Sequence, residues 1–288
     1  MLTFLYFLNA ILMIALPLGL GIFLFRKLGT SWRIFGVGMV TFVLSQVFHL
    51  PFNFLILNPG MERLGLDFDI PLDLVVIAVL AGLSAGVFEE VARYLSYRFW
   101  LKSDADRTWS NALMFGAGHG GIEAIILGIL AMFALVAFVA LRDESVLSLL
   151  SAEQVETVGE SLTAYWSAPW YAALLGAVER AIALSVHLSA TVIVLQVFRC
   201  GRLYWLLLAI LWHVVVDGLA VFAGATWGIY TTEGLMFLLG LAGVGIIFLL
   251  REPAENPAPD APPSGSGTLP EIESQPPSPE NLENSRYV

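Results

Sequence analysis

The sequence predicts an all-α membrane protein that crosses the bilayer about seven times. Hydrophobic residues make up 58% of its 288 residues, charged residues make up only 13%, and the mean hydropathy is +0.79. A soluble domain is instead about 45–50% apolar and about 25% charged. The apolar residues are also gathered into long runs, and about 20 of them in succession cross the hydrocarbon core as a helix.

Seven apolar segments are long enough to cross a bilayer. The first has no basic segment before it and no small-residue cleavage site after it, so we expect a retained span rather than a cleaved signal. The third, fourth and fifth are long enough to tilt, kink or protrude. The expected spans are residues 2–25, 34–57, 72–101, 109–141, 168–198, 203–224 and 229–250.

The connections between these spans differ in length and composition. Residues 58–71 are expected to form a loop that contains Pro59 and Gly60, and residues 143–166 to include a short amphipathic surface helix around 148–162. The chain then divides into a helical membrane domain, 1–251, and a tail, 252–288. The tail is rich in Pro, Ser and Glu and has too few apolar residues to fold, so we expect a disordered cytosolic segment.

Basic residues predict the orientation of the spans, because loops rich in Lys and Arg face the cytoplasm. We therefore expect the N-terminus outside and the C-terminus in the cytoplasm of a multi-pass protein in a bacterial plasma membrane. The opposite loops carry only Arg63 and Arg142. The basic residues at the expected cytoplasmic side are Arg26, Lys27, Arg33, Arg98, Lys102, Arg107, Arg199, Arg202 and Arg251.

Composition also limits the partners. The net charge is −10, and no basic patch suggests binding to nucleic acid. The single cysteine, Cys200, excludes an internal disulfide and lies at the end of a span. The composition therefore predicts that the lipid bilayer surrounds the protein.

Polar side chains inside five spans recur every three or four residues, so those of one span share a helix face. An ionised side chain at the membrane centre costs roughly 2.5–3.5 kcal/mol even on a lenient scale, which makes each a functional-site hypothesis. These residues are Gln46, His49 and Asn53; Glu89, Glu90, Arg93 and Tyr94; His119 and Glu123; Glu179, Arg180 and His187; and His213 and Asp217.

Four of these residues lie at one depth. Glu89, His119, His187 and His213 are about 10–12 residues from the span ends expected at the cytosol, or about 15–18 Å at 1.5 Å per residue. Each could singly be structural, since a buried histidine can hydrogen-bond a neighbouring helix and Glu89 can pair with Arg93. A shared layer on four helices predicts one polar functional centre.

Such a centre can activate water. A guanidinium favours the anionic form of a nearby carboxyl group, whereas burial and a second carboxylate oppose it, so one glutamate can remain a base. Histidines can donate hydrogen bonds to the water or to a developing oxyanion. No Ser or Cys lies with a base in a nucleophile arrangement. A Zn²⁺ site that takes three or four ligands from His119, His187, His213 and a Glu is an alternative that the sequence leaves open.

Three motifs on separate spans resemble those of the CAAX-protease and bacteriocin-processing superfamily of intramembrane proteases. They are Glu89-Glu90-x-x-Arg93, Phe115-x-x-x-His119 and His213-x-x-x-Asp217. Two further stretches resemble, more specifically, the YhfC-type membrane peptidases. They are Gly118-His119-Gly120-Gly121-x-Glu123 and Glu179-Arg180 with His187. The resemblance covers about residues 30–250.

The resemblance implies a glutamate-type intramembrane endopeptidase that needs no cofactor and cleaves a transmembrane or lipidated protein near the cytosolic half of the bilayer. Glu89 would activate water, His119 and His213 would support the water and the oxyanion, and Glu90 and Arg93 would hold the centre. The superfamily's last motif more often ends in Asn, where this chain has Asp. The supporting residues would be Glu123, Glu179, His187, Asp217, His49 and Gln46.

Two other functions use similar residues. A proton-coupled transporter also needs intramembrane Glu and His, but it predicts paired broken helices in internal repeats, and the sequence shows no fixed-period repeat. A non-catalytic membrane partner or immunity protein would use the polar residues for packing alone.

Overall fold

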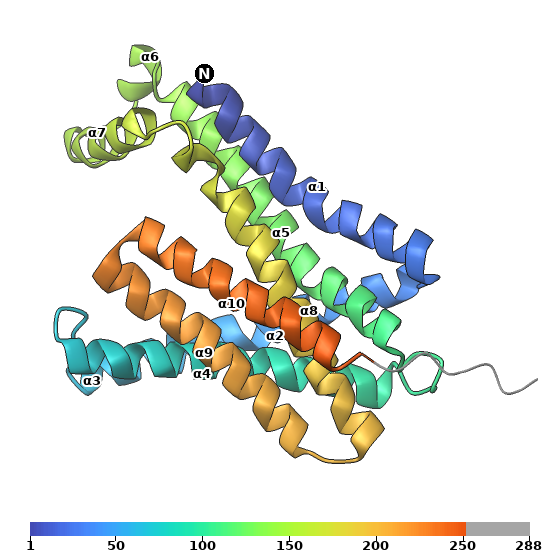
Figure 1. Cartoon of the computed structure of the whole chain (residues 1–288). Coiled ribbons are helices and arrows are strands. Elements are labelled where there is room, and N and C mark those ends of the chain that lie inside the picture. The colour runs from blue at the N-terminus through green and yellow to red at the C-terminus, as the bar shows by residue number, and fades with distance from the viewer. Residues whose placement is uncertain (252–288) are drawn as a thin grey trace, which may run out of the picture. The chain divides into compact units, whose positions relative to one another are not determined.

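The computed structural model describes residues 1–251, and every regular element in that part of the chain is a helix (Figure 1). Seven helical segments there are long and apolar enough to cross a membrane, which confirms the predicted fold class. The tail predicted at 252–288 lies outside the described residues. The long helices are α1 (Leu2–Leu28), α2 (Trp32–Phe52), α4 (Pro71–Phe99), α5 (Trp109–Ala140), α8 (Leu175–Cys200), α9 (Tyr204–Trp227) and α10 (Ile229–Leu249).

Local sequence signals set several of the helix ends. The Ser31 side chain accepts a hydrogen bond from the backbone N–H of Arg33 at the start of α2, and Thr108 accepts one from Asn111 at the start of α5. These side chains satisfy backbone donors that have no partner within the first turn. At the other ends, Gly29 and Gly201 adopt the left-handed conformation that ends α1 and α8.

The second span continues further than the sequence predicted. A π-helical turn, η1 (Asn53–Leu57), leads directly into α3 (Asn58–Arg63), so the expected loop at 58–71 begins only after residue 63. Pro59 does not end the helix because it lies in the first turn of α3, where a backbone N–H needs no partner within that helix. The connection to α4 is correspondingly short.

The surface helix also differs from its predicted bounds. It is α7 (Ala152–Ser167), and it follows a short α6 (Glu144–Leu147). The side chains of Ser151 and Gln154 each bond to the other's backbone N–H, a capping box that makes Ser151 the N-cap. Tyr6 of α1 donates a hydrogen bond to the Tyr165 carbonyl at 2.8 Å, so α7 is attached to the start of α1. A 3-10 turn, η2 (Ala172–Leu174), then leads into α8.

Six helices form a ring in which each contacts the next, in the order α2, α5, α8, α10, α9, α4 and back to α2. α1 lies outside this ring and packs along α5 (Figure 1). Glycines allow several of these contacts to be backbone to backbone. A Cβ on Gly118 of α5 would collide with the Phe35 carbonyl of α2, and a Cβ on Gly82 of α4 would lie 2.8 Å from the Val214 carbonyl oxygen of α9.

One half of the ring is filled with apolar side chains, and we call it the closed half. It lies near the connections 101–108 and 201–203. Its members are almost completely buried, and Trp109 donates a hydrogen bond to the Ile247 carbonyl at 2.9 Å, which joins α5 to α10. The buried residues of the closed half include Ile34, Phe35, Tyr97, Leu101, Leu113, Met114, Phe115, Val192, Val194, Leu195, Ala209 and Ile247.

Candidate active site

Helix α4 brings two carboxylates and a guanidinium into the ring. Glu90 and Arg93 are fully buried and Glu89 is 6% exposed. Arg93 Nη1 forms an ion pair with Glu90 Oε1, while Arg93 Nη2 lies 3.6 Å from Glu89 Oε2. In the sequence, Arg93 follows Glu89 by four residues and Glu90 by three, and in the structure the closer partner is Glu90. Both spacings are within reach on a helix, so surrounding side chains decide between them.

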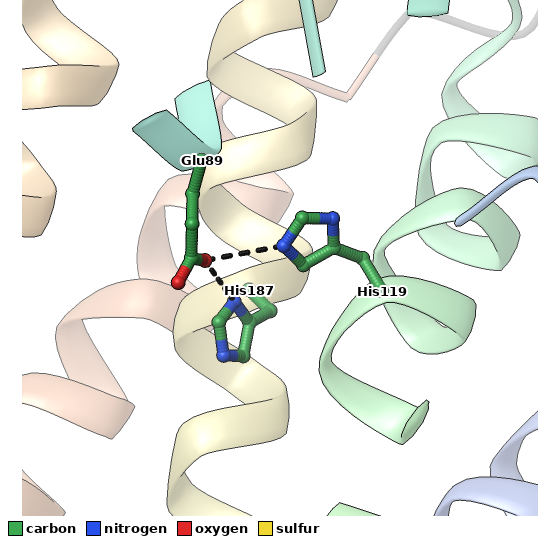
Figure 2. Close-up of side chains that lie close together, drawn as sticks. All are labelled: Glu89, His119 and His187. Atoms are coloured by element: carbon green, nitrogen blue, oxygen red, sulfur yellow. Dashed lines mark hydrogen bonds and ion pairs between the residues drawn. The ribbon is translucent and has the colours of Figure 1, made fainter. Parts of the chain in front are cut away.

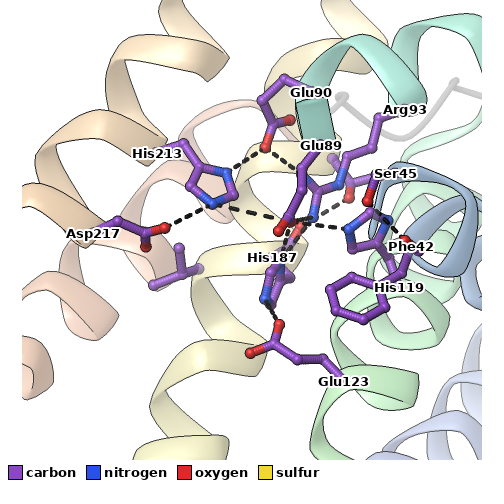
Figure 3. Close-up of polar contacts among 12 residues, drawn as sticks. Phe42, Ser45, Glu89, Glu90, Arg93, His119, Glu123, His187, His213 and Asp217 are labelled. Atoms are coloured by element: carbon purple, nitrogen blue, oxygen red, sulfur yellow. Dashed lines mark hydrogen bonds and ion pairs between the residues drawn. The ribbon is translucent and has the colours of Figure 1, made fainter. Parts of the chain in front are cut away.

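Three histidines from three other helices surround one oxygen of Glu89 (Figure 3), and Figure 2 shows two of them, His119 and His187. Glu89 Oε2 lies 3.1 Å from His119 Nε2, 3.8 Å from His187 Nδ1 and 4.0 Å from His213 Nε2. The four residues predicted to share a layer therefore converge on a single point. All three histidine side chains are buried.

Hydrogen bonds define the tautomer of His187. Arg93 Nη2 lies 2.7 Å from His187 Nδ1, and because arginine can only donate, this nitrogen is the acceptor. The other nitrogen, Nε2, then carries the hydrogen and donates to Glu123 Oε2 at 2.8 Å. His187 thus presents a lone pair toward Arg93 and an N–H toward Glu123.

A second ion-pair network holds Glu123 from the side opposite His187. Arg180 of α8 pairs with both Glu123 and Glu179. Both glutamates were predicted as supporting residues. Arg180 was noted as an arginine inside a span next to a glutamate, but it was given no role in the site.

His213 links the buried carboxylate of α4 to a more accessible one on its own helix. Its Nδ1 lies 2.8 Å from Glu90 Oε1, and its Nε2 lies 3.3 Å from Asp217 Oδ2 (Figure 3). The i+4 pairing of His213 with Asp217 that the sequence suggested is therefore present. A ring with both nitrogens protonated satisfies both acceptors, and Asp217 is 40% exposed.

Side chains of α2 and the turn after it form a chain of hydrogen bonds that ends on the other oxygen of Glu89. Gln46 Nε2 donates to Glu89 Oε1 at 3.2 Å, and Gln46 Oε1 lies 3.2 Å from His49 Nδ1. The chain continues from His49 Nε2 to Asn53, whose carboxamide oxygen accepts from Ser84. Ser84 was not predicted, because a hydroxyl in an apolar helix carries no distinctive sequence signal.

Aromatic packing and a glycine position the two histidines nearest to Glu89. The His119 ring is fully buried and meets Phe42 edge to face, with centroids 5.2 Å apart and an interplanar angle of 82°. A Cβ on Gly120 would lie 2.6 Å from His187 Cδ2. Gly120 therefore provides the space that the His187 imidazole occupies.

The centre lies at the inner end of a cavity of about 960 Å³. Glu90, Arg93 and His119 lie behind its surface, whereas nine of the site residues contribute to its wall. Much of the remaining wall is apolar. The nine residues are Gln46, His49, Glu89, Glu123, Glu179, Arg180, His187, His213 and Asp217.

Glu89, His119 and His187 form a group that could hold a metal ion, since each offers one ligand atom and these atoms lie within 4.8 Å of one another. The zinc set suggested by the sequence contained three histidines and a Glu, and three of its members are in this group. His213 is outside the group, and its ring nitrogens face Glu90 and Asp217.

The fold and the site define a multi-pass membrane protein with a buried Glu-His-His group beside a cavity among its helices. The chain belongs to the YhfC family: the family described as YhfC intramembrane metalloprotease matches residues 12–237. It is also 32% identical over 212 residues to the "Uncharacterized membrane protein YhfC" of Bacillus subtilis (strain 168), across 72% of this chain and 79% of that protein. No solved structure matches the chain.

Proposed function

We propose that this chain is a metal-dependent intramembrane protease that hydrolyses a peptide bond of a membrane-embedded protein. The observation that carries this proposal is the convergence of Glu89, His119 and His187 at the inner end of the cavity. The family description as a metalloprotease supports the same chemistry. The motif resemblance to the CAAX-protease superfamily supports a protease whose residues come from several helices.

The donor set fits a zinc ion. Zinc bound through nitrogen and oxygen at about 2.0–2.1 Å places the ligand atoms of a tetrahedral site roughly 3.3–3.4 Å apart. The observed separations from Glu89 Oε2 are 3.1 Å to His119 Nε2 and 3.8 Å to His187 Nδ1. Two histidines and one glutamate are also a donor set that holds catalytic zinc with an open position.

The partners of His187 support the fit and add one requirement. Its Nε2–H donates to the Glu123 carboxylate, the arrangement that commonly orients a metal-binding histidine. Its Nδ1 lone pair, however, accepts a hydrogen bond from Arg93 Nη2. A metal on Nδ1 must replace that bond, and Arg93 then retains Glu90 as its ion-pair partner.

When bound, zinc would polarise the scissile carbonyl and make a hydroxide nucleophile available near neutral pH. Gln46 holds the second oxygen of Glu89 through its amide N–H, which orients the carboxylate toward the two histidines. The two ring nitrogens of His213 lie against Glu90 Oε1 and Asp217 Oδ2, and each nitrogen can hold a proton there. Because His213 also lines the cavity, it is placed to donate a proton to the leaving amine.

The glutamate-only mechanism predicted from the sequence uses the same residues with a different role for Glu89. In that mechanism Glu89 is the general base toward water, and His119 and His213 are its supporting donors. In the metal-dependent mechanism Glu89 is a ligand. Metal dependence therefore separates the two mechanisms directly.

The test is to purify the protein, measure its bound metal, and assay cleavage of a set of membrane-spanning peptides in proteoliposomes. We expect equimolar zinc or another transition metal, loss of cleavage after chelation, and recovery on adding the metal back. His119→Ala should lose both metal and cleavage, whereas Thr226→Ala, at an exposed position in the last turn of α9, should retain both. Full cleavage by the metal-free protein, abolished by Glu89→Gln, would establish the glutamate-only mechanism instead.

A further inference from the structure

The closed half and the cavity lie on opposite sides of Glu89, and chain direction shows this helix by helix. α5 runs away from the connection 101–108. Along it, Phe115 of the closed half comes before His119, and Leu130 of the cavity wall comes after it. α8 runs in the opposite direction, and there the cavity residue Ala183 precedes His187 while Val192 of the closed half follows it.

Two other helices of the ring show the same order. On α9, Ala209 of the closed half precedes His213 and the cavity residue Ala220 follows it. On α10, which runs back, the cavity residue Thr232 precedes Ile247 of the closed half. The cavity therefore extends from Glu89 only toward the end of the ring that carries α3, α6 and α7.

Charges in the connections distinguish the same two ends. The connections and adjoining helix ends at the closed end are basic: within residues 1–251 they carry nine Lys and Arg residues, including Arg33 and Arg107, and only Asp104 and Asp106 as acids. The connections at the open end carry two basic residues, Arg63 and Arg142. Their acidic residues are Glu62, Asp67, Asp69, Asp143, Glu144, Glu153, Glu156 and Glu160. Connections rich in Lys and Arg face the cytoplasm, so the closed end is the cytoplasmic one.

We infer that the cavity opens on the extracytoplasmic side of the membrane and takes a hydrophobic protein segment that enters from that side. That its occupant is a peptide rests on the proposed function, whereas the direction of access rests on the packing and the charges. At about 960 Å³ the cavity is at the upper end of the range of ligand sites, about 300–1,000 Å³. Apolar wall residues such as Val47, Ile126 and Leu130 suit an apolar segment.

This inference narrows the substrate class predicted from the sequence. Glu89 lies ten residues from the end of α4 at the closed end and eighteen from its other end, so the centre is in the cytosolic half. The buried apolar cluster of the closed half nevertheless lies between the cavity and the cytosolic end. A protein lipidated on its cytosolic side is therefore disfavoured, and a transmembrane segment inserted from outside is favoured.

Thiol labelling tests the direction of access without requiring catalysis. The native Cys200 is exposed at the closed end and serves as the reporter for that side. In a Cys200→Ser background, Ala183→Cys and Ala220→Cys report on the cavity wall, and Ala209→Cys, at a position 0% exposed in the closed half, is the buried control. Each chain is treated with a membrane-impermeant maleimide in right-side-out and in inside-out vesicles.

We expect both cavity thiols to react in right-side-out vesicles and to lose this labelling in inside-out vesicles. Cys200 should show the reverse, and Ala209→Cys should react only after denaturation. Labelling of the cavity thiols from the same side as Cys200, or an exchange of the two sides, would overturn the inference. If the cavity labels from outside but the purified protein cleaves nothing, the direction of access stands and the proposed function fails. Cleavage combined with cavity labelling from the cytosolic side would support the proposed function and overturn the direction of access.

Discussion

The same six helices form the closed half and the cavity half of the ring, but their side chains are buried in the first and partly exposed in the second. In the closed half, residues such as Phe115 and Leu195 are fully buried. In the cavity half, Leu130 is 54% exposed, and the carboxylate side chains of Glu179 and Asp217 are 46% and 40% exposed. Within a bilayer, helix association depends on close packing and interhelical hydrogen bonds. The packing in the closed half therefore stabilises the helices that hold the polar centre beside the cavity.

Among the substitutions that we propose, we expect the largest loss of stability at Arg93, which lies at the boundary between the two halves. Arg93→Leu leaves Glu90 as a buried carboxylate without its arginine partner, which should cost about 3–5 kcal/mol of unfolding free energy. Adding Glu90→Gln removes that charge while keeping an oxygen that can accept from His213, so the double variant should recover much of the loss. Denaturant unfolding in micelles, followed by circular dichroism, measures both. A single variant as stable as the wild type would show that the ion pair does not support the centre.

A matched pair of leucines compares the halves directly. Leu195→Ala removes a side chain that is 0% exposed in the closed half, and Leu→Ala changes at such positions cost about 2–5 kcal/mol. Leu130→Ala changes the cavity wall, where we expect a change within about 0.5 kcal/mol. The same unfolding measurement checks both variants. Equal losses would mean that the cavity wall is packed as tightly as the closed half.

The smallest expected effect on stability concerns the cavity half alone. Glu123→Gln removes the charge that faces His187 Nε2–H and should lower metal affinity by about 10–100-fold, with the fold retained. Glu179→Gln is the matched control, because Glu179 contacts Arg180 but neither His187 nor Glu89. Calorimetric titration of the metal-free protein with Zn²⁺ measures the difference. Unchanged affinity in Glu123→Gln would separate Glu123 from metal binding and favour the glutamate-only mechanism.

The sequence predicted the seven spans well because the length of an apolar run is set by the thickness of the bilayer. It also predicted that Glu89, His119, His187 and His213 meet, since equal depth on several helices is visible in residue counts. It did not predict that the second span continues to Arg63, because a π-helical turn has no clear sequence signature.

Depth does not determine how a helix is rotated about its own axis, and this limited the prediction of roles. His213 lies at the right depth for a metal ligand, but its nitrogens face Glu90 and Asp217. Arg93 can reach either glutamate of α4, and its choice depends on His119 and His187, which approach Glu89 from other helices. The sequence likewise did not show which side of Glu89 becomes the closed half, because this depends on how the six helices pack together.

Glycine contacts around the centre bring the backbones of neighbouring helices close together. A side chain on Gly116 would meet Leu188 Cα at 2.8 Å, one on Gly118 would collide with the Phe35 carbonyl, and one on Gly82 would meet the Val214 carbonyl oxygen. These three contacts join α5 to α8, α2 to α5, and α4 to α9. Backbones at such close approach cannot slide past one another without collision. His119 and His187 therefore keep their spacing on α5 and α8, and Glu89 and His213 keep theirs on α4 and α9.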